Sequence, residues 1–220
     1  QLVGTAMGTR MAPNYANIYM GRFEEELLDG YPLKFKLWVR FIDDVFCIWE
    51  HGEEELLKFI EYANSQSPSI KFTHEYDTQK VNFLDTWVKV DDDRTLYTSL
   101  YNKPTDTFDY LHYSSAHPSH CKSAGPRGQL LRIRRICKKD ADFEYFGKRC
   151  CSHYERRGYP RDLVAKAFDS IKTLSQDDLL QVKEKKDGGK NLFLTIPYNQ
   201  RNPHLRGIVN KHWHLVNTTT

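Results

Sequence analysis

Two adjacent acidic residues, Asp43 and Asp44, divide an apolar and aromatic stretch that runs from Leu37 to Trp49. Aromatic and β-branched residues on both sides favour strands, so the pattern predicts a β-hairpin with the two acids at its tip. Ionised carboxylates beside aromatic strands are costly to bury unless a cation compensates their charge. A divalent metal site is therefore one interpretation of the pair, and a polar two-residue turn is the other.

A segment rich in glycine and threonine, residues 4–9, lies upstream of this hairpin. It precedes apolar residues at helical spacing that begin near Pro13, and proline is favoured in the first turn of a helix. Glycine permits close backbone approach to a ligand, and a helix N-terminus favours phosphate. The sequence thus predicts a loop and a helix suited to a phosphate-bearing ligand, followed by the acid-tipped hairpin.

This order of a glycine loop, a helix and an acid-tipped hairpin resembles the palm domain of reverse transcriptases. More closely, the chain is similar to the reverse transcriptases of Penelope-like retroelements in several ordered blocks. These blocks are Gly4–Thr9, Ala12–Pro13, Ala16–Asn17, Phe41–Asp44, Asn82–Asp85, Lys103–Asp106, Tyr110–His112, His117–His120 and Arg132–Cys137. They cover nearly the whole chain, and the resemblance implies an RNA-directed DNA polymerase, a nucleotidyltransferase that copies the RNA of a retrotransposon.

The resemblance implies an α+β fold with three parts. Residues 1–103 correspond to a partial reverse transcriptase palm, with a loop-helix and an antiparallel sheet that carries the Asp-Asp hairpin. Residues 104–182 correspond to an α-helical thumb that resembles a helix-turn-helix. Residues 183–220 correspond to a linker and a connector strand and helix.

The same resemblance implies two-metal phosphoryl transfer with Mg²⁺, or alternatively Mn²⁺, and names the site residues. Asp43 and Asp44 are the expected catalytic residues and metal ligands. The expected nucleotide- and template-binding residues are Met7, Gly8, Thr9, Arg10 and Asn17, and the expected primer grip is Phe83, Leu84 and Asp85. The expected partners are an RNA template, a DNA primer and deoxynucleotides.

Polymerases of this family also use a carboxylate from a strand that precedes the glycine loop, and the sequence starts at that loop. We therefore expect the isolated chain to be inactive, with the N-terminal palm and fingers and a C-terminal endonuclease domain supplied by a longer protein. Two alternatives are a non-catalytic nucleic-acid-binding helical module and a decayed retroelement relic without a selected role.

Positive charge is concentrated in the middle of the chain. Residues 117–166 hold 13 Lys and Arg against 5 Asp and Glu, a balance of +8, whereas residues 1–116 have a balance of −8. A basic stripe indicates phosphate binding, and its charges do not alternate in sign as they do on many solvated helix faces. The residues expected to contact the nucleic-acid backbone are His117, His120, Arg132, Arg134, Arg135, Lys138 and Lys139.

Helical spacing and turn residues predict further elements. A helix is expected at Glu53–Asn64, and three more are expected to begin at Pro118, Pro126 and Pro160, after stops at Gly125 and Gly158. The first two of these three, around His117–Cys137, are expected to form a helix-turn-helix. Strands that extend the Asp43 sheet are expected at Ile70–Tyr76, Val81–Val90 and Leu96–Tyr101, and a strand and a helix near the end at Leu192–Tyr198 and Pro203–Trp213.

The five cysteines are odd in number and lack a regular spacing, which indicates reduced thiols in an intracellular protein. A structural zinc site is an alternative for the Cys- and His-rich set His117, His120, Cys121, Cys137, Cys150, Cys151 and His153. Its spacing matches no common zinc finger, so buried cysteines and phosphate-contacting histidines are the simpler interpretation. No apolar run approaches the roughly 20 residues of a membrane helix, so no membrane is expected, and a nuclear location is expected from the family.

Overall fold

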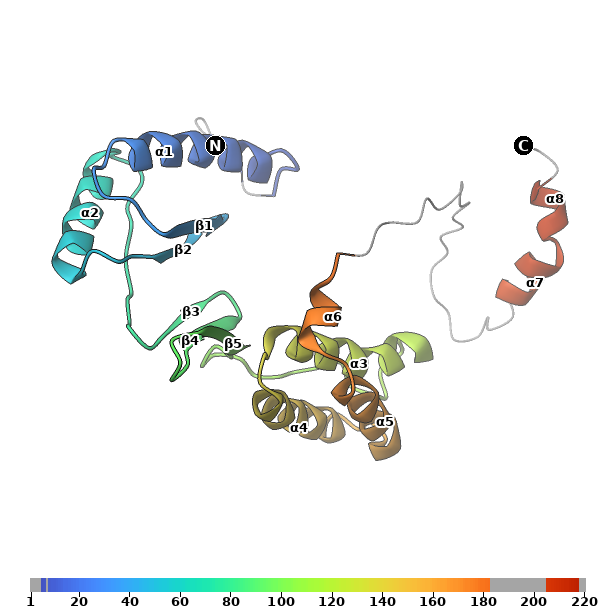
Figure 1. Ribbon diagram of the computed structural model, residues 1–220. Helices are drawn as coiled ribbons and strands as arrows, with labels where there is room; N and C mark the ends of the chain where they lie inside the picture. The colour runs from blue at the N-terminus through green and yellow to red at the C-terminus, as the bar shows by residue number, and fades with distance from the viewer. Residues whose placement is uncertain (1–4, 7, 183–204, 218–220) are drawn as a thin grey trace. The chain divides into compact units, whose positions relative to one another are not determined.

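The computed structural model describes residues 5, 6, 8–182 and 205–217. The fold is α+β, as predicted, and Figure 1 shows its elements along the chain. They are α1 (Ala12–Asp29), β1 (Leu37–Phe41), β2 (Asp44–Ile48), α2 (Glu53–Ser65), β3 (Lys80–Phe83), β4 (Thr86–Val90), β5 (Leu96–Leu100), α3 (Ser119–Ile136), α4 (Asp140–Arg156), α5 (Arg161–Lys172), α6 (Gln176–Leu180), α7 (Leu205–Lys211) and α8 (Trp213–Asn217). The chain divides into unit 1, Gln1–Leu96, and unit 2, Tyr97–Thr220.

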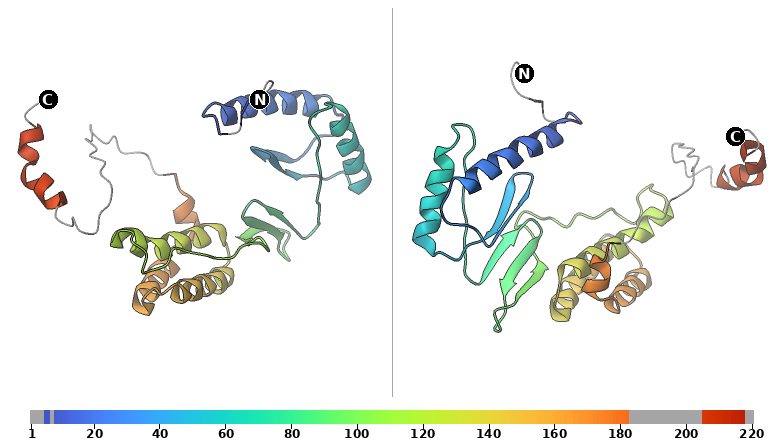
Figure 2. Two further views of the ribbon diagram at one scale, coloured as in Figure 1. Left: turned by 180° about the vertical axis from the view of Figure 1, so that it is seen from behind. Right: turned by 45° about the horizontal axis from the view of Figure 1, so that its top comes forward.

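The core of unit 1 is small and aromatic. Leu27 of α1 packs with Phe59 and Ala63 of α2, and all three are buried. Rings from the intervening segment close this core, since Phe35 lies 4.8 Å from Phe59 between ring centroids and Tyr31 lies 5.1 Å from it. Figures 1 and 2 show α1 and α2 beside the β1–β2 hairpin that this core supports. The helices predicted near Pro13 and at Glu53–Asn64 are thus confirmed.

The predicted acid hairpin is also confirmed. β1 and β2 pair antiparallel with Phe41 opposite Asp44, which leaves a two-residue turn of Ile42 and Asp43. Ile42 has a φ of 57°, in the left-handed region that β-branched residues rarely adopt. A positive φ at the first turn position is typical of the type II′ turns that match the twist of paired strands.

The prediction of one strand at Val81–Val90 is wrong, because this segment is a second hairpin. β3 and β4 pair antiparallel around a turn of Leu84 and Asp85, and Leu84 has a φ of 55°. These strands belong to a three-stranded sheet of order β3-β4-β5, so they do not extend the two-stranded sheet that carries Asp44. The sequence Phe-Leu-Asp-Thr thus repeats the turn geometry of Phe-Ile-Asp-Asp.

The strand predicted at Ile70–Tyr76 is wrong as well, and a side chain explains why. The backbone N–H of Phe72 donates to Asn64 Oδ1 at 2.6 Å, and Asn64 Nδ2 donates to the carbonyl of Phe72 at 3.1 Å. One amide side chain at the end of α2 therefore satisfies backbone groups that a neighbouring strand would otherwise pair. The segment has the residue pattern of a strand, but hydrogen bonds to Asn64 attach its backbone to helix α2.

Helices α3, α4 and α5 form the core of unit 2. Each presents an apolar stripe at helical spacing, and the buried members are Leu130, Ile133, Cys137, Phe143, Cys150, Tyr154, Val164, Ala167 and Ile171. Gly158 ends α4 with a φ of 81°, and Pro160 precedes α5. These two helix boundaries agree with the prediction, and three residues, 137–139, connect α3 to α4.

The prediction that a helix begins at Pro126 is wrong, because α3 continues through it. A proline inside a helix removes one backbone hydrogen bond and crowds the preceding turn. Pro126 is nevertheless fully buried, so its ring contributes apolar area to the core of unit 2. The predicted helix-turn-helix at His117–Cys137 is accordingly one helix, and the compact helical connection occurs at 137–139.

The remaining predictions concern the last part of the chain. The predicted strand Leu192–Tyr198 lies outside the described residues, and helices α7 and α8 occupy much of the region of the predicted helix Pro203–Trp213. Within the described ranges, no helix combines the length and the apolar character needed to span a bilayer.

Helix packing in unit 2 predicts opposite effects for two glycine-to-alanine substitutions. A Cβ at buried Gly147 would lie 2.7 Å from Cε2 of Phe168, whereas a Cβ at exposed Gly128 on α3 meets nothing within 4 Å. Gly147→Ala is expected to lower the free energy of unfolding by about 1–3 kcal/mol through overpacking. Gly128→Ala is expected to raise it by about 0.5–1 kcal/mol, the gain in helix propensity. Denaturant titration followed by circular dichroism measures both, and equal effects would contradict the packing of α4 on α5.

Candidate functional site

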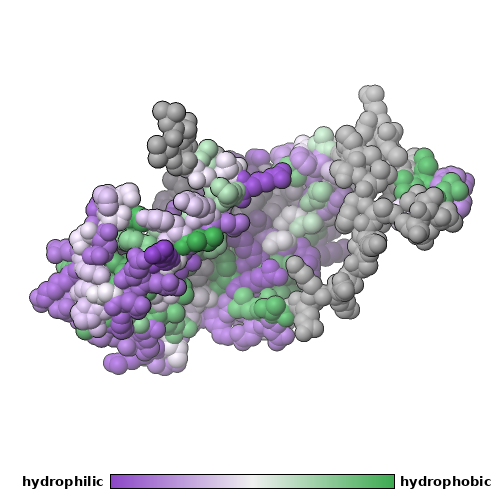
Figure 3. Space-filling model, turned by 90° about the horizontal axis from the view of Figure 1, so that it is seen from above, coloured by the Kyte–Doolittle hydropathy of each residue, from purple (hydrophilic) through white to green (hydrophobic). Residues whose placement is uncertain are grey.

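Both acids of the first hairpin are accessible. Asp43 lies in the turn and Asp44 is the first residue of β2, and both side chains are exposed. Residues opposite each other in antiparallel strands share a face, so Asp44 lies on the same face as Phe41. That face is open on β1, where Leu37, Val39 and Phe41 are exposed. Figure 3 views the molecule from above the orientation of Figure 1 and shows hydrophobic and hydrophilic residues intermixed on the surface.

The opposite face of β1 carries an inward-facing arginine. Arg40 Nε lies 2.9 Å from Glu24 Oε2, and the two side chains are only 11% and 12% exposed. This contact is an ion pair whose geometry falls outside that of a hydrogen bond. Arg40 Nη1 also donates to Asn17 Oδ1 at 2.9 Å and to the carbonyl of Ile42 at 2.8 Å. One guanidinium therefore fixes the hairpin turn to α1.

A tryptophan completes this network. Trp38 Nε1 donates to Glu24 Oε1 at 3.0 Å, so both oxygens of this carboxylate face groups of β1. Asn17, predicted as a nucleotide- and template-binding residue, is thereby brought to the base of the acid turn. Arg40 and Glu24 were not predicted as site residues. Their signal in the sequence is a charged residue at an alternate position of an otherwise apolar strand, which requires an opposite charge where that face is covered.

The glycine loop forms a tight turn before α1. Gly8 has a φ of 91°, and Thr9 donates to the carbonyl of Ala6 through its backbone N–H and through Oγ1, at 3.3 Å and 3.1 Å. The positive φ explains the glycine at this position, since most other residues would be strained there. Arg10 is exposed next to the turn, and Met7 lies outside the described residues.

The predicted primer-grip residues lie at the second hairpin turn. The ring of Phe83 is 5.7 Å from that of Phe46 on β2, two residues beyond Asp44. Leu84 and Asp85 form the turn itself, so Asp85 is at a tip and not within a strand. The structure therefore brings Phe83 toward the acid hairpin through an aromatic contact.

The donor set at the hairpin tip determines which metal chemistry it suits. Mg²⁺ is commonly held by one or two carboxylates together with waters and ligand phosphates, and Asp43 and Asp44 supply two carboxylates. In the described part of the chain, no three His, Cys, Asp or Glu side chains converge on a metal position. Two carboxylates suit a Mg²⁺ ion that is also bound by waters and ligand phosphates. The zinc alternative needs a cluster of His and Cys side chains, and the described residues contain none.

The cysteines of unit 2 differ in exposure. Cys137 and Cys150 are buried in the core, and burial raises the pKa of the Cys150 thiol to about 12. Cys121 is exposed, with its Sγ 3.4 Å from His120 Nε2 at the start of α3. His117 is exposed as well, and its Nδ1 lies 3.2 Å from Ser115 Oγ. These positions leave both histidines accessible to a phosphate.

The arginines of α3 point in different directions. Arg134 is buried, with Nε donating to the carbonyl of Leu174 at 2.6 Å and Nη2 2.8 Å from Asp140 Oδ1. Its guanidinium is therefore engaged inside unit 2, which the prediction of a backbone contact did not anticipate. Arg135 is exposed, and Arg132 is half-buried. The separation follows from the helix, because consecutive residues project about 100° apart.

The two lysines that follow α3 also have internal partners. Lys138 Nζ lies 2.8 Å and 2.9 Å from the two carboxylate oxygens of Asp177, and Lys139 Nζ lies 3.9 Å from the ring centroid of Tyr97. Both lysines remain exposed, so these surface contacts are weak and exchangeable.

One family model matches the chain. The Animal helix-turn-helix domain matches residues 109–169, which include α3, α4 and most of α5. This match supports the helix-turn-helix prediction over a wider range than His117–Cys137. No curated protein and no solved structure matches the chain.

The buried ion pair of unit 1 predicts different effects for two glutamates of α1. Glu24→Ala leaves Arg40 buried without its partner and is expected to lower the free energy of unfolding by about 3 kcal/mol. Glu26→Ala removes only an exposed contact with Arg22, with side chains 67% and 84% exposed, and is expected to cost less than about 1 kcal/mol. Denaturant titration followed by tryptophan fluorescence checks both, since Trp38 donates to Glu24. Equal destabilisation would show that Arg40 does not depend on Glu24.

Proposed function

We propose that this chain is part of an RNA-directed DNA polymerase in which unit 1 supplies an acidic hairpin to metal-dependent phosphoryl transfer. The observation that carries the proposal is the Arg40 network, because it joins the acid turn to the helix behind the glycine turn through Asn17. A hairpin used only as a connection would not require a buried guanidinium at its tip. Catalytic constellations, in contrast, need supports that hold them in one geometry.

Each of these residues of unit 1 would have a separate role in catalysis. Asp43 and Asp44 would hold Mg²⁺, which when bound supplies charge stabilisation and activates an oxygen nucleophile. Asn17 and Arg40 position the turn that carries the acids. The turn at Gly8 leaves space for a close backbone approach, since a Cβ there would meet nothing within 4 Å and its φ favours glycine. The RNA template, DNA primer and deoxynucleotides are the corresponding substrates and partners.

A second candidate function is nucleic-acid binding by unit 2 without catalysis. The specific observation that favours it is the helix-turn-helix match at residues 109–169, which coincides with the basic segment of the sequence. The exposed side chains of Arg127 and Arg135 are cations that can contact phosphates. This function is compatible with the first, since a polymerase also needs a surface that holds its duplex.

The repeated hairpin turn provides an internal control for metal binding. Mn²⁺, a paramagnetic substitute for Mg²⁺, is expected to broaden the backbone NMR signals of residues 42–44 and to leave those of residues 84–86 sharp. The second turn has the same geometry but Thr86 in place of the second acid. Asp43→Asn is expected to abolish the broadening and Asp85→Asn to preserve it. RNA-templated primer extension by a polypeptide that contains this chain should likewise be lost in Asp43→Asn.

Broadening of both hairpins to the same extent would contradict the metal site, because it would show only general attraction of cations to acidic turns. Broadening that persists in Asp43→Asn would contradict it equally.

Salt dependence tests the nucleic-acid surface of unit 2. Binding to a labelled duplex is expected to weaken with salt, and Arg135→Gln is expected to reduce the slope of log K against log salt by about 0.7–0.9 for one lost phosphate contact. Arg22→Gln is the matched control, since this exposed arginine belongs to α1 of unit 1. Fluorescence anisotropy measures both, and an unchanged slope in Arg135→Gln would remove this residue from the interface.

A further inference from the structure

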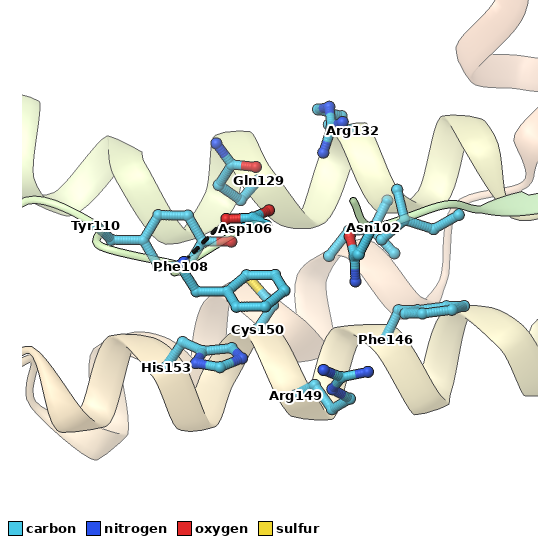
Figure 4. A pocket seen from close by; sticks show the side chains of 12 residues that line it. Asn102, Asp106, Phe108, Tyr110, Gln129, Arg132, Phe146, Arg149, Cys150 and His153 are labelled. Atoms are coloured by element: carbon cyan, nitrogen blue, oxygen red, sulfur yellow. Dashed lines mark hydrogen bonds between the residues drawn. The ribbon is translucent and has the colours of Figure 1, made fainter. Parts of the chain in front are cut away.

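A pocket of about 190 Å³ lies within unit 2, between α3, α4 and the segment that leads into α3 (Figure 4). Gln129 and Arg132 line it from α3, and Phe146 and Arg149 line it from α4. Figure 4 shows the two arginines on opposite walls, with the preceding segment between them. The pocket thus combines two cations with aromatic and amide groups.

The charges of the lining favour an anion. The acidic residue of the lining is Asp106, and its Oδ1 accepts a hydrogen bond from the backbone N–H of Phe108 at 2.9 Å. Burial, and then Arg156 and Arg149, lower the pKa of His153, whereas Asp106 acts in the opposite direction. The charged groups of the lining are therefore two guanidinium groups and one carboxylate, an excess of positive charge. Guanidinium groups bind phosphate oxygens in planar, paired geometry.

The floor of the pocket is flat and apolar. The ring of Phe108 stacks on that of His153 with a centroid distance of 4.3 Å and an interplanar angle of 13°. Phe108 adopts a φ of 54°, a left-handed conformation that the contact with Asp106 supports. Tyr110 and Cys150 also line the pocket, and burial raises the pKa of both side chains. Apolar and aromatic surface is what the face of a base requires.

The size of the pocket limits its occupant. Sites for whole small molecules usually measure about 300–1,000 Å³, so this pocket suits one group of a larger ligand. Asn102 and Gln129 supply amides, each of which can donate and accept hydrogen bonds, as base edges require.

We propose that this pocket binds one unpaired nucleotide of a nucleic-acid strand, with its base on the aromatic floor and its phosphate between Arg132 and Arg149. This inference rests on the proposed nucleic-acid binding by unit 2, and it adds that an unstacked base is recognised. A continuous duplex keeps its bases paired and stacked, so it exposes backbone and base edges but not the base face that an aromatic pocket would contact.

The test compares two labelled duplexes with the same paired sequence, one continuous and one with a single additional unpaired nucleotide in one strand. The 220-residue chain is expected to bind the duplex with the unpaired nucleotide about tenfold more tightly, because one base would stack on an aromatic side chain. Arg149→Gln and Asn102→Ala are expected to remove most of this preference. Arg161→Gln is the matched control, because this exposed arginine at the start of α5 lies outside the pocket lining, and it should leave the preference unchanged.

The outcomes separate the two proposals. Equal binding of both duplexes, or a preference that survives Arg149→Gln and Asn102→Ala, overturns the pocket assignment and leaves nucleic-acid binding intact. Absence of binding to either duplex overturns both. Preferential binding of an acidic peptide would assign the pocket to a protein partner and overturn the inference.

A crosslinking measurement does not depend on the stability of the variants. A photoreactive pyrimidine placed at the unpaired position is expected to crosslink to wild-type residues 102–110 or 146–153, as located by mass spectrometry. Crosslinks confined to other parts of the chain would overturn the assignment.

Discussion

The buried guanidinium of Arg40 is the interaction on which unit 1 depends. A charged group that is 11% exposed is stable only when its charge is compensated, and here Glu24 supplies an ion pair while Asn17 and the carbonyl of Ile42 accept hydrogen bonds from Nη1. A two-stranded hairpin is marginal by itself in water, so its attachment to α1 has a large share in its stability. The same contact determines where the turn, and therefore Asp43, lies relative to the helix. Stability and site geometry thus rest on one side chain.

The two hairpins of unit 1 share a turn but differ in chemistry. Each places a large apolar residue at positive φ and an aspartate next to it, and such strain of about 1–3 kcal/mol persists only where the surroundings enforce it. At the first hairpin the carbonyl of the strained Ile42 is held by Arg40. At the second hairpin, the ring of Phe83, next to the strained Leu84, packs against the ring of Phe46. The added acid, Asp44, is the feature that distinguishes the proposed metal site from its neighbour.

Local patterns in the sequence predict the helices and turns well, because each depends on a few neighbouring residues. The acid hairpin, the helix behind Pro13 and the helix boundary at Gly158 and Pro160 are examples. Predictions failed where distant contacts decided the structure. Burial of the Pro126 ring keeps α3 continuous, and Asn64 removes the segment around Phe72 from any sheet. Arg134 is similar, since the charge of a basic run does not reveal which member folds inward against Asp140. The catalytic and primer-grip roles stay predictions.

The proline inside α3 also affects how this helix opens. Because Pro126 has no N–H, the carbonyl of Lys122 lacks its usual helical partner, and the first turns are joined to the rest by fewer hydrogen bonds. The residues after Pro126, with Leu130 and Ile133, are anchored in the core, whereas those before it carry His120 and Cys121 in exposed positions. Hydrogen exchange should therefore separate α3 into a fast N-terminal part and a slow C-terminal part. The early turns of α3 are thus expected to open locally without disturbing the core of the helical unit.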